Sequence, residues 1–178
     1  MDFHYISIGT GCGIAQELRR RELRKCSLPF DWKYIWSINT INLMIEDKME
    51  ALLDANCWNL SEDQSDMQNT NEVRYTHTKY SGLASVHDFY SETIDIEQYV
   101  NKMRKRVNRF FEIMQTSMKP IIFIRDEQSY ALFSKYGKDS YFYDQVDRFC
   151  KNIKSINSNL DFKIVCYIEH FNQPTLDP

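Results

Sequence analysis

The sequence predicts an α/β fold: a mostly parallel sheet with helices packed on it and a small hairpin insertion. Strand-like and helix-like segments alternate at both ends of the chain, the order expected when helical crossovers join parallel strands. Residues 121–124 form a continuous apolar run, typical of a strand buried on both faces of a parallel sheet. The chain has 178 residues, enough for a core of its own, which predicts a single domain over residues 1–178.

The N-terminal part is predicted to contain a strand, a helix, a loop and a second helix. Residues 5–8 are apolar and end at a glycine-rich turn, as a buried strand leading into a helix does. From Cys12 onward, apolar residues recur at helical spacing. Pro29 holds the preceding residue extended, so residues 27–32 are predicted to be a connecting loop. Apolar spacing then predicts a helix over residues 37–54.

The middle of the chain is predicted to be a loop followed by a hairpin. Residues 59–71 are polar and show no periodicity, which favours an exposed loop. Residues 73–78 and 82–89 are rich in β-forming side chains around the turn at residues 80–82, so they are expected to form a hairpin or two short strands.

The C-terminal part is predicted to alternate helices and strands. Asp95 is expected to cap a long helix through Gln115. Further expected elements are a strand at 121–124, a helix at 144–155 and a strand at 162–168. The basic side chains of the long helix are predicted to be mostly solvated: Lys102, Arg104, Lys105, Arg106 and Arg109.

Composition and charge argue against several classes of function. The net charge is −3, whereas a dedicated nucleic-acid-binding domain is normally basic. The 5 cysteines lack metal-ligand spacing, so we expect reduced thiols and neither metal nor cofactor. The sequence shows neither a secretory signal nor an apolar run of the ~18 residues that a membrane span needs. We therefore expect a cytoplasmic protein, or one of the host cytoplasm if a virus encodes it; the oligomeric state stays open.

The turn between the first strand and first helix is the best candidate site. Cys12 is expected near the first-turn amides and the positive end of the helix dipole, which would lower a thiol pKa and favour a nucleophile. Alternatively, Cys12 is a small core residue in a tight turn. The turn lacks the third glycine of a dinucleotide fingerprint and a Walker lysine. Predicted substrate-binding residues are Gly9, Thr10, Gly11, Gly13 and Arg125, the last for an anionic group, although a surface ion pair would also explain Arg125.

A thiol nucleophile needs a base, and His87 is the strongest candidate among the 4 histidines. It follows small residues on a predicted strand, whereas His4 lies near the terminus. A solvent-exposed or core histidine is the alternative. Neighbouring side chains on a strand point to opposite faces, so Asp88 is poorly placed to orient His87, and Asp31 is a second candidate for this role.

Several motifs resemble the papain-like cysteine peptidase family known as domain of unknown function 1796. They occur in order over most of the chain: residues 6–12, 23–27, 29–32 and 87–89, Arg106 and Arg109 before Phe110, and residues 123–125. The resemblance implies Cys12 as nucleophile and His87 as base. It suggests a cysteine-dependent hydrolase or transferase acting on a peptide or small molecule.

Two other classes of function stay open. A non-thiol α/β enzyme would bind a nucleotide, sugar or other anionic ligand at the turn formed by residues 9–13, with help from Arg125. A non-catalytic binding module would use neither Cys12 nor His87.

Overall fold

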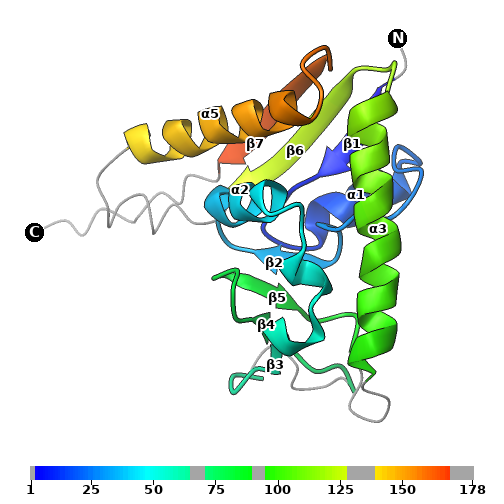
Figure 1. The fold of residues 1–178 in the computed structure, drawn as a ribbon, viewed down its shortest axis with the longest axis vertical. Helices are drawn as coiled ribbons and strands as arrows, with labels where there is room; N and C mark the ends of the chain where they lie inside the picture. Colours follow the sequence, from blue (N-terminus) through cyan, green and yellow to red (C-terminus); the bar gives the residue numbers. More distant parts are fainter. Residues whose placement is uncertain (1–2, 65–70, 90–94, 128–138, 169–178) are drawn as a thin grey trace, which may run out of the picture.

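The computed structural model describes residues 3–64, 71–89, 95–127 and 139–168, and it contains two sheets. One is parallel, with strand order β1-β6-β7, and the other is antiparallel, with order β2-β5-β4-β3. Figure 1 shows the parallel sheet in the upper half, the antiparallel sheet in the lower half, and helix α3 running alongside both. The predicted α/β class is confirmed. The predicted hairpin is part of a four-stranded sheet.

The parallel sheet consists of β1 (His4–Ser7), β6 (Ile121–Glu127) and β7 (Phe162–Ile168). In the centre of the sheet, Ile6 pairs with Phe123, which pairs with Ile164. Helix α5 (Asp139–Ile156) packs on this sheet, with the Phe149 ring 5.0 Å from that of Phe123. β6 is longer than predicted, and alternate residues are only half-buried, so the strand is not sealed on both faces.

The antiparallel sheet consists of β2 (Lys33–Ile35), β3 (Trp58–Leu60), β4 (Tyr75–His77) and β5 (Leu83–Ser85). The predicted hairpin is confirmed as β4 and β5, in which Tyr75 pairs with Ser85. Gly82 at its turn has a φ of +78°, a conformation that glycine adopts without steric cost. Both predicted strands are shorter than expected, and His87 lies beyond the end of β5. β2 was not predicted, and β3 overlaps the residues predicted as a loop.

Helix α2 (Ile38–Glu46) is shorter than the predicted helix over residues 37–54. Ser37 caps its N-terminus by accepting a hydrogen bond from the Asn39 amide. The helix stops because Lys48 and Met49 adopt left-handed backbone angles, and the Asp47 carboxylate accepts the Met49 amide at 2.9 Å. Two short 3₁₀ helices, η1 (Ala51–Leu53) and η2 (Ala55–Cys57), continue the chain.

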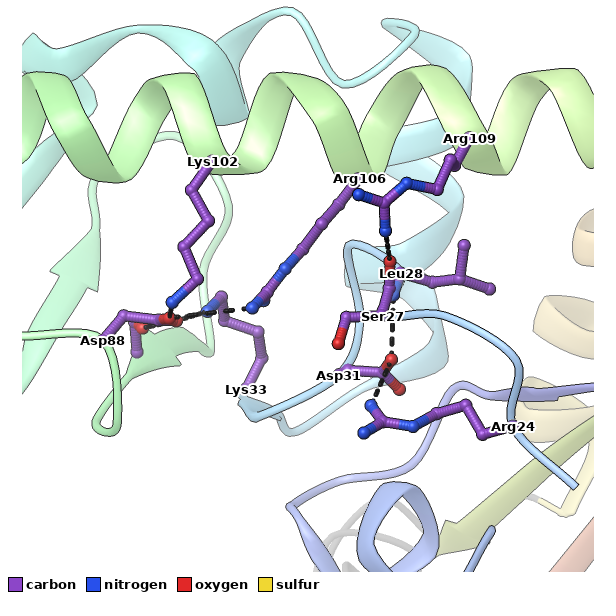
Figure 2. A network of polar contacts seen from close by, with 10 residues as sticks. Arg24, Ser27, Leu28, Asp31, Lys33, Asp88, Lys102, Arg106 and Arg109 are labelled. Carbon is purple, nitrogen blue, oxygen red and sulfur yellow. Dashed lines mark hydrogen bonds and ion pairs between the residues drawn. The ribbon is translucent and has the colours of Figure 1, made fainter. Parts of the chain in front are cut away.

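Helix α3 (Ile96–Thr116) confirms the predicted long helix, and the Asp95 carboxylate caps it through the Gln98 amide at 2.8 Å. Its basic face is less solvated than predicted, because Arg106 is buried and Arg109 is half-buried. Figure 2 shows Lys102 and Arg106 reaching from this face toward the buried Asp88 carboxylate, and Arg109 donating to the Ser27 carbonyl. The helix therefore supplies positive charge to the interior as well as apolar side chains to the core.

Candidate functional site

The turn after β1 is held in place by neighbouring strands. The Asp126 carboxylate at the end of β6 accepts the Thr10 amide at 2.7 Å, and the Thr10 carbonyl accepts the Ile35 amide of β2 at 3.1 Å. A Cβ atom at Gly9 would lie 2.4 Å from the Asp126 Oδ1 atom. Gly9 is therefore needed for the close approach of Asp126, whereas a Cβ at Gly13 would meet nothing within 4 Å.

Arg125 supports this turn from inside the protein. Its side chain is 0% exposed and bonds Glu127 at 2.6 Å. Its guanidinium also donates to the carbonyls of Ile8 at 2.8 Å and Ile35 at 3.3 Å. The ion pair is buried, in contrast to the surface pair suggested by the sequence. A substrate anion would have to displace these contacts, and anion binding by Arg125 stays a prediction.

Cys12 occupies the N-cap position of helix α1 (Gly13–Arg20), and its side chain caps no amide. Within the described residues, the amides of Gly11, Cys12 and Gly13 have no hydrogen-bond acceptor. Such amides at a helix N-terminus can receive a negatively charged oxygen. The half-buried thiol and these donors thus lie together at the start of α1.

The pKa of the Cys12 thiol is raised to about 11, in contrast to the lowered pKa expected from its position. Burial is the largest cause, and the carboxylates of Asp88, Glu72 and Asp31 raise it further, against the positive charge of Lys33. Burial and these carboxylates act against the helix N-terminus, which favours the thiolate. Cys12 is therefore a neutral thiol at neutral pH.

His87 lies in the bend after β5, where its Nδ1 atom is 3.0 Å from the Glu72 carboxylate. Its side chain is 40% exposed. Glu72 was missed in the sequence because it lies 15 residues away, between the segment predicted as a loop and the first predicted strand of the hairpin. Extending the predicted hairpin pairing beyond Tyr75 would have placed residue 72 beside residues 87–89, since Val73 donates its amide to the Phe89 carbonyl.

Asp88 does not support His87 through any contact among the described residues. Its side chain is 3% exposed and pairs with Lys33, and its Oδ1 atom accepts Lys102 at 2.5 Å. Burial alone would raise the pKa of Asp88, but these cations and Arg106 bring it well below the ordinary range. Asp88 is therefore an ionised centre of a buried charge cluster (Figure 2).

Asp31 organises the loop beside His87. Its carboxylate accepts the Leu28 amide and pairs with Arg24, both at 2.8 Å. The next residue, Trp32, has a φ of 65°, which is rare for a bulky side chain and needs surrounding contacts to persist. The Trp32 ring meets the edge of the His87 ring, with centroids 6.5 Å apart. Asp31 thus holds the loop that carries Trp32, and no contact among the described residues joins Asp31 to His87.

Cys12 is therefore linked to Glu72, Asp88 and Asp31 through their charges, and His87 is linked to Glu72 by direct contact. Within the described part of the chain, no three His, Cys, Asp or Glu side chains are grouped as metal ligands. No described helix combines the length and apolarity needed to cross a membrane.

Comparison with known proteins identifies the family. A family model described as "Putative papain-like cysteine peptidase (DUF1796)" matches residues 3–172, and the chain belongs to this family. The chain is also similar to "Uncharacterized protein R408" of Acanthamoeba polyphaga mimivirus, with 31% identity over 140 residues. The alignment covers 71% of this chain and 62% of the viral protein, so the chain spans less than two thirds of that relative. No solved structure matches the chain.

Proposed function

From this family membership we propose that the protein is a cysteine-dependent acyl hydrolase with Cys12 as nucleophile and His87 as general base. The observation that carries the proposal is the 3.0 Å contact between His87 Nδ1 and Glu72, a carboxylate whose charge also acts on the Cys12 thiol. Glu72 thus contacts His87 and also acts on Cys12 through its charge. With Nδ1–H donated to Glu72, the Nε2 atom is the proton acceptor, and Glu72 takes the orienting role expected of Asp31 or Asp88.

The proposed reaction has two steps. His87 takes the thiol proton as Cys12 Sγ attacks the acyl carbonyl, and the amides of Gly11, Cys12 and Gly13 receive the resulting oxyanion. His87 then returns the proton to the leaving group, which departs and leaves a thioester on Cys12. In the second step a water molecule, deprotonated by His87, attacks the thioester, and Cys12 regains its proton as the acid is released.

The raised pKa of Cys12 decides how the thiol would be activated. At a pKa of about 11, only about one molecule in 10⁴ carries a thiolate at pH 7. A stored thiolate therefore cannot supply the nucleophile, and proton transfer to His87 must accompany attack. The histidine is accordingly more important than it would be beside a thiol with a low pKa.

An anionic ligand at the turn itself is less favoured than an uncharged acyl group. The Asp126 carboxylate already accepts the Thr10 amide, so this amide is not available to a phosphate oxygen. Arg125 is committed to Glu127 and two carbonyls. These contacts weigh against the nucleotide or sugar-phosphate alternative.

Trapping of the acyl intermediate tests the proposal. The protein is mixed with p-nitrophenyl acetate, release of p-nitrophenolate is followed, and peptides are analysed by mass spectrometry for a new acetyl group. We expect acetylation of Cys12 in the wild type, in Cys57→Ala and in Cys26→Ala, which remove other half-buried thiols. Acetylation spread evenly over the cysteines, or unchanged p-nitrophenolate release by Cys12→Ala, would contradict the proposal.

A further inference from the structure

Three basic side chains converge on the single carboxylate of Asp88 (Figure 2). Lys33 and the Ser85 hydroxyl bond its Oδ2 atom, the latter at 3.0 Å. Lys102 lies 2.5 Å and Arg106 lies 3.9 Å from its Oδ1 atom. Three basic side chains thus share one carboxylate, and burial lowers the pKa of one of them, Lys33.

Arg106 is the least satisfied member of this cluster. It is 7% exposed, and its Nη1 atom is buried without a hydrogen-bond partner among the described residues. A buried charged donor without a partner is costly and persists where another group supplies the acceptor. Figure 2 shows the guanidinium aimed into the cluster, toward Asp88.

Lys102 connects the cluster to solvent. Its side chain is 49% exposed, whereas those of Lys33 and Asp88 are 0% and 3% exposed. The buried Lys33–Asp88 pair is held in place, so a ligand arriving from solvent would meet Lys102 first and Arg106 behind it. Both side chains come from one face of α3, four residues apart, which makes them neighbours on the helix.

The cluster also lies within electrostatic reach of Cys12. The charges of Lys33 and Asp88 both influence the pKa of the thiol. Lys33 belongs to β2, whose Ile35 amide is bonded to the carbonyl of Thr10 in the cysteine turn. The same strand therefore contacts the turn and carries one cation of the cluster.

We propose that Lys102 and Arg106 form an anion subsite that binds a carboxylate or phosphate group of the substrate attacked by Cys12. That the anion belongs to a substrate rests on the proposed hydrolase function, whereas anion binding itself requires no reaction at Cys12. An oxyanion would give Arg106 Nη1 its missing acceptor and would share Lys102 with Asp88. The subsite selects acyl compounds that carry a negative group, such as an acidic side chain or a phosphate ester.

Calorimetric titration of the Cys12→Ala protein tests the subsite without interference from thiol chemistry. Inorganic phosphate and succinate are titrated separately at low ionic strength, and Lys102→Gln is compared with Lys105→Gln. Both variants remove one positive charge from an exposed position of α3, so they differ in place and not in net charge. We expect saturable binding of at least one anion, about ten-fold weaker in Lys102→Gln and unchanged in Lys105→Gln.

A second variant tests the guanidinium. Arg106→Lys keeps the charge but loses the forked donors, and we expect weaker binding with little loss of thermal stability. Tighter binding of phosphate would identify a phosphate ester, and tighter binding of succinate a carboxylate. Absence of saturable binding, or equal weakening by Lys102→Gln and Lys105→Gln, would overturn the subsite. Cys12 acetylation without anion binding would contradict the subsite alone, and anion binding without acetylation would contradict the hydrolase alone.

Discussion

His77 and His87 lie on the same hairpin but in opposite surroundings. His77, at the end of β4, is 5% exposed; its Nδ1 atom accepts the Lys79 and Tyr80 amides, and its Nε2 atom bonds the Ala51 carbonyl at 3.0 Å. His87, beyond β5, is 40% exposed and contacts Glu72 through one ring nitrogen. Both nitrogens of His77 are committed to the backbone, whereas Nε2 of His87 has no partner among the described residues.

This difference separates a structural histidine from one that can exchange protons. The two amide donors fix the hydrogen of His77 on Nε2, and the ring is stacked on Tyr80 at a centroid distance of 4.5 Å. A proton added to Nδ1 would break two hydrogen bonds. His87 can accept a proton on Nε2 without such losses, and Glu72 would stabilise the resulting charge. Substitutions should therefore affect activity at one site and stability at the other.

Replacement of His87 should have the largest effect on activity. We expect His87→Ala to slow acetylation of Cys12 by about 10²–10⁴-fold, the usual contribution of a positioned general base. The free energy of unfolding should change by less than about 0.5 kcal/mol because the side chain lies at the surface. Rates of p-nitrophenolate release and urea unfolding curves measure the two effects. An acetylation rate like that of the wild type would remove His87 from the mechanism.

Replacement of Asp88, the next residue, should instead destabilise the fold. Asp88→Asn leaves Lys33 buried without its counter-ion, and we expect the free energy of unfolding to fall by about 3–5 kcal/mol. Loss of this charge also removes one cause of the raised pKa of Cys12. In the folded fraction, Cys12 should therefore react no more slowly than in the wild type. Unchanged stability together with slow acetylation would mean that Asp88 serves His87 after all.

Replacement of His77 should have the opposite pattern of effects to His87→Ala: a loss of stability with little change in activity. We expect His77→Ala to lower the free energy of unfolding by about 2–3 kcal/mol, because two amides and a buried carbonyl lose their partner. Acetylation of Cys12 by the folded protein should be unchanged within about two-fold. Chemical unfolding and acetylation rates on the same preparation test the pair of expectations. A large loss of acetylation with intact stability would reverse the roles assigned to the two histidines.

Glu72→Gln should change the rate of Cys12 acetylation by a smaller factor. Whether the rate falls or rises should depend on whether His87 is present. In the wild-type background we expect acetylation to slow by about ten-fold, because the imidazole loses its orienting carboxylate. In the His87→Ala background it should rise slightly, because Glu72 is one of the groups that raise the pKa of Cys12. A double-mutant cycle measures this reversal. The same decrease in both backgrounds would show that Glu72 acts independently of His87.

The smallest expected effect, about 1 kcal/mol, is the contribution of His77 to the pH dependence of the free energy of unfolding. Burial lowers the pKa of His77, opposed by its bond to Ala51. The unfolded chain therefore binds more protons than the folded chain below about pH 6.5. This contribution to the free energy of unfolding is present above that pH and is lost as the pH falls below it. His77→Ala should flatten this part of the curve.

Periodic parts of the fold were predictable, and polar partnerships were not. The apolar spacing and Asp95 cap of α3 are local signals, and both appear in the structure. The end of α2 depends on left-handed angles at Lys48 and Met49, which apolar spacing does not reveal because Met49 and Leu52 stay buried beyond the helix. Arg125 was read as exposed because its pairing with Glu127 and two distant carbonyls exists only after folding.

The candidate site shows the same limit. The sequence singled out the cysteine turn and His87, and both lie within the residues that the family model matches. Their catalytic roles stay predictions. The sequence also predicted a low thiol pKa from the helix position, and this was wrong because burial and three carboxylates act in the other direction. Glu72 directly follows the segment without periodicity, and the pairing of Val73 with Phe89 brings it to His87.

The most direct test of the central claim is the alkylation of Cys12 by iodoacetamide at pH 7, with free cysteine as reference. An unassisted thiol with a pKa of about 11 should react about 10²-fold more slowly than free cysteine, because its thiolate is that much scarcer. If His87 and Glu72 activate Cys12, the wild type reacts at least as fast as free cysteine and His87→Ala falls to the slow rate. Equally slow alkylation of Cys12 in both proteins would contradict the account.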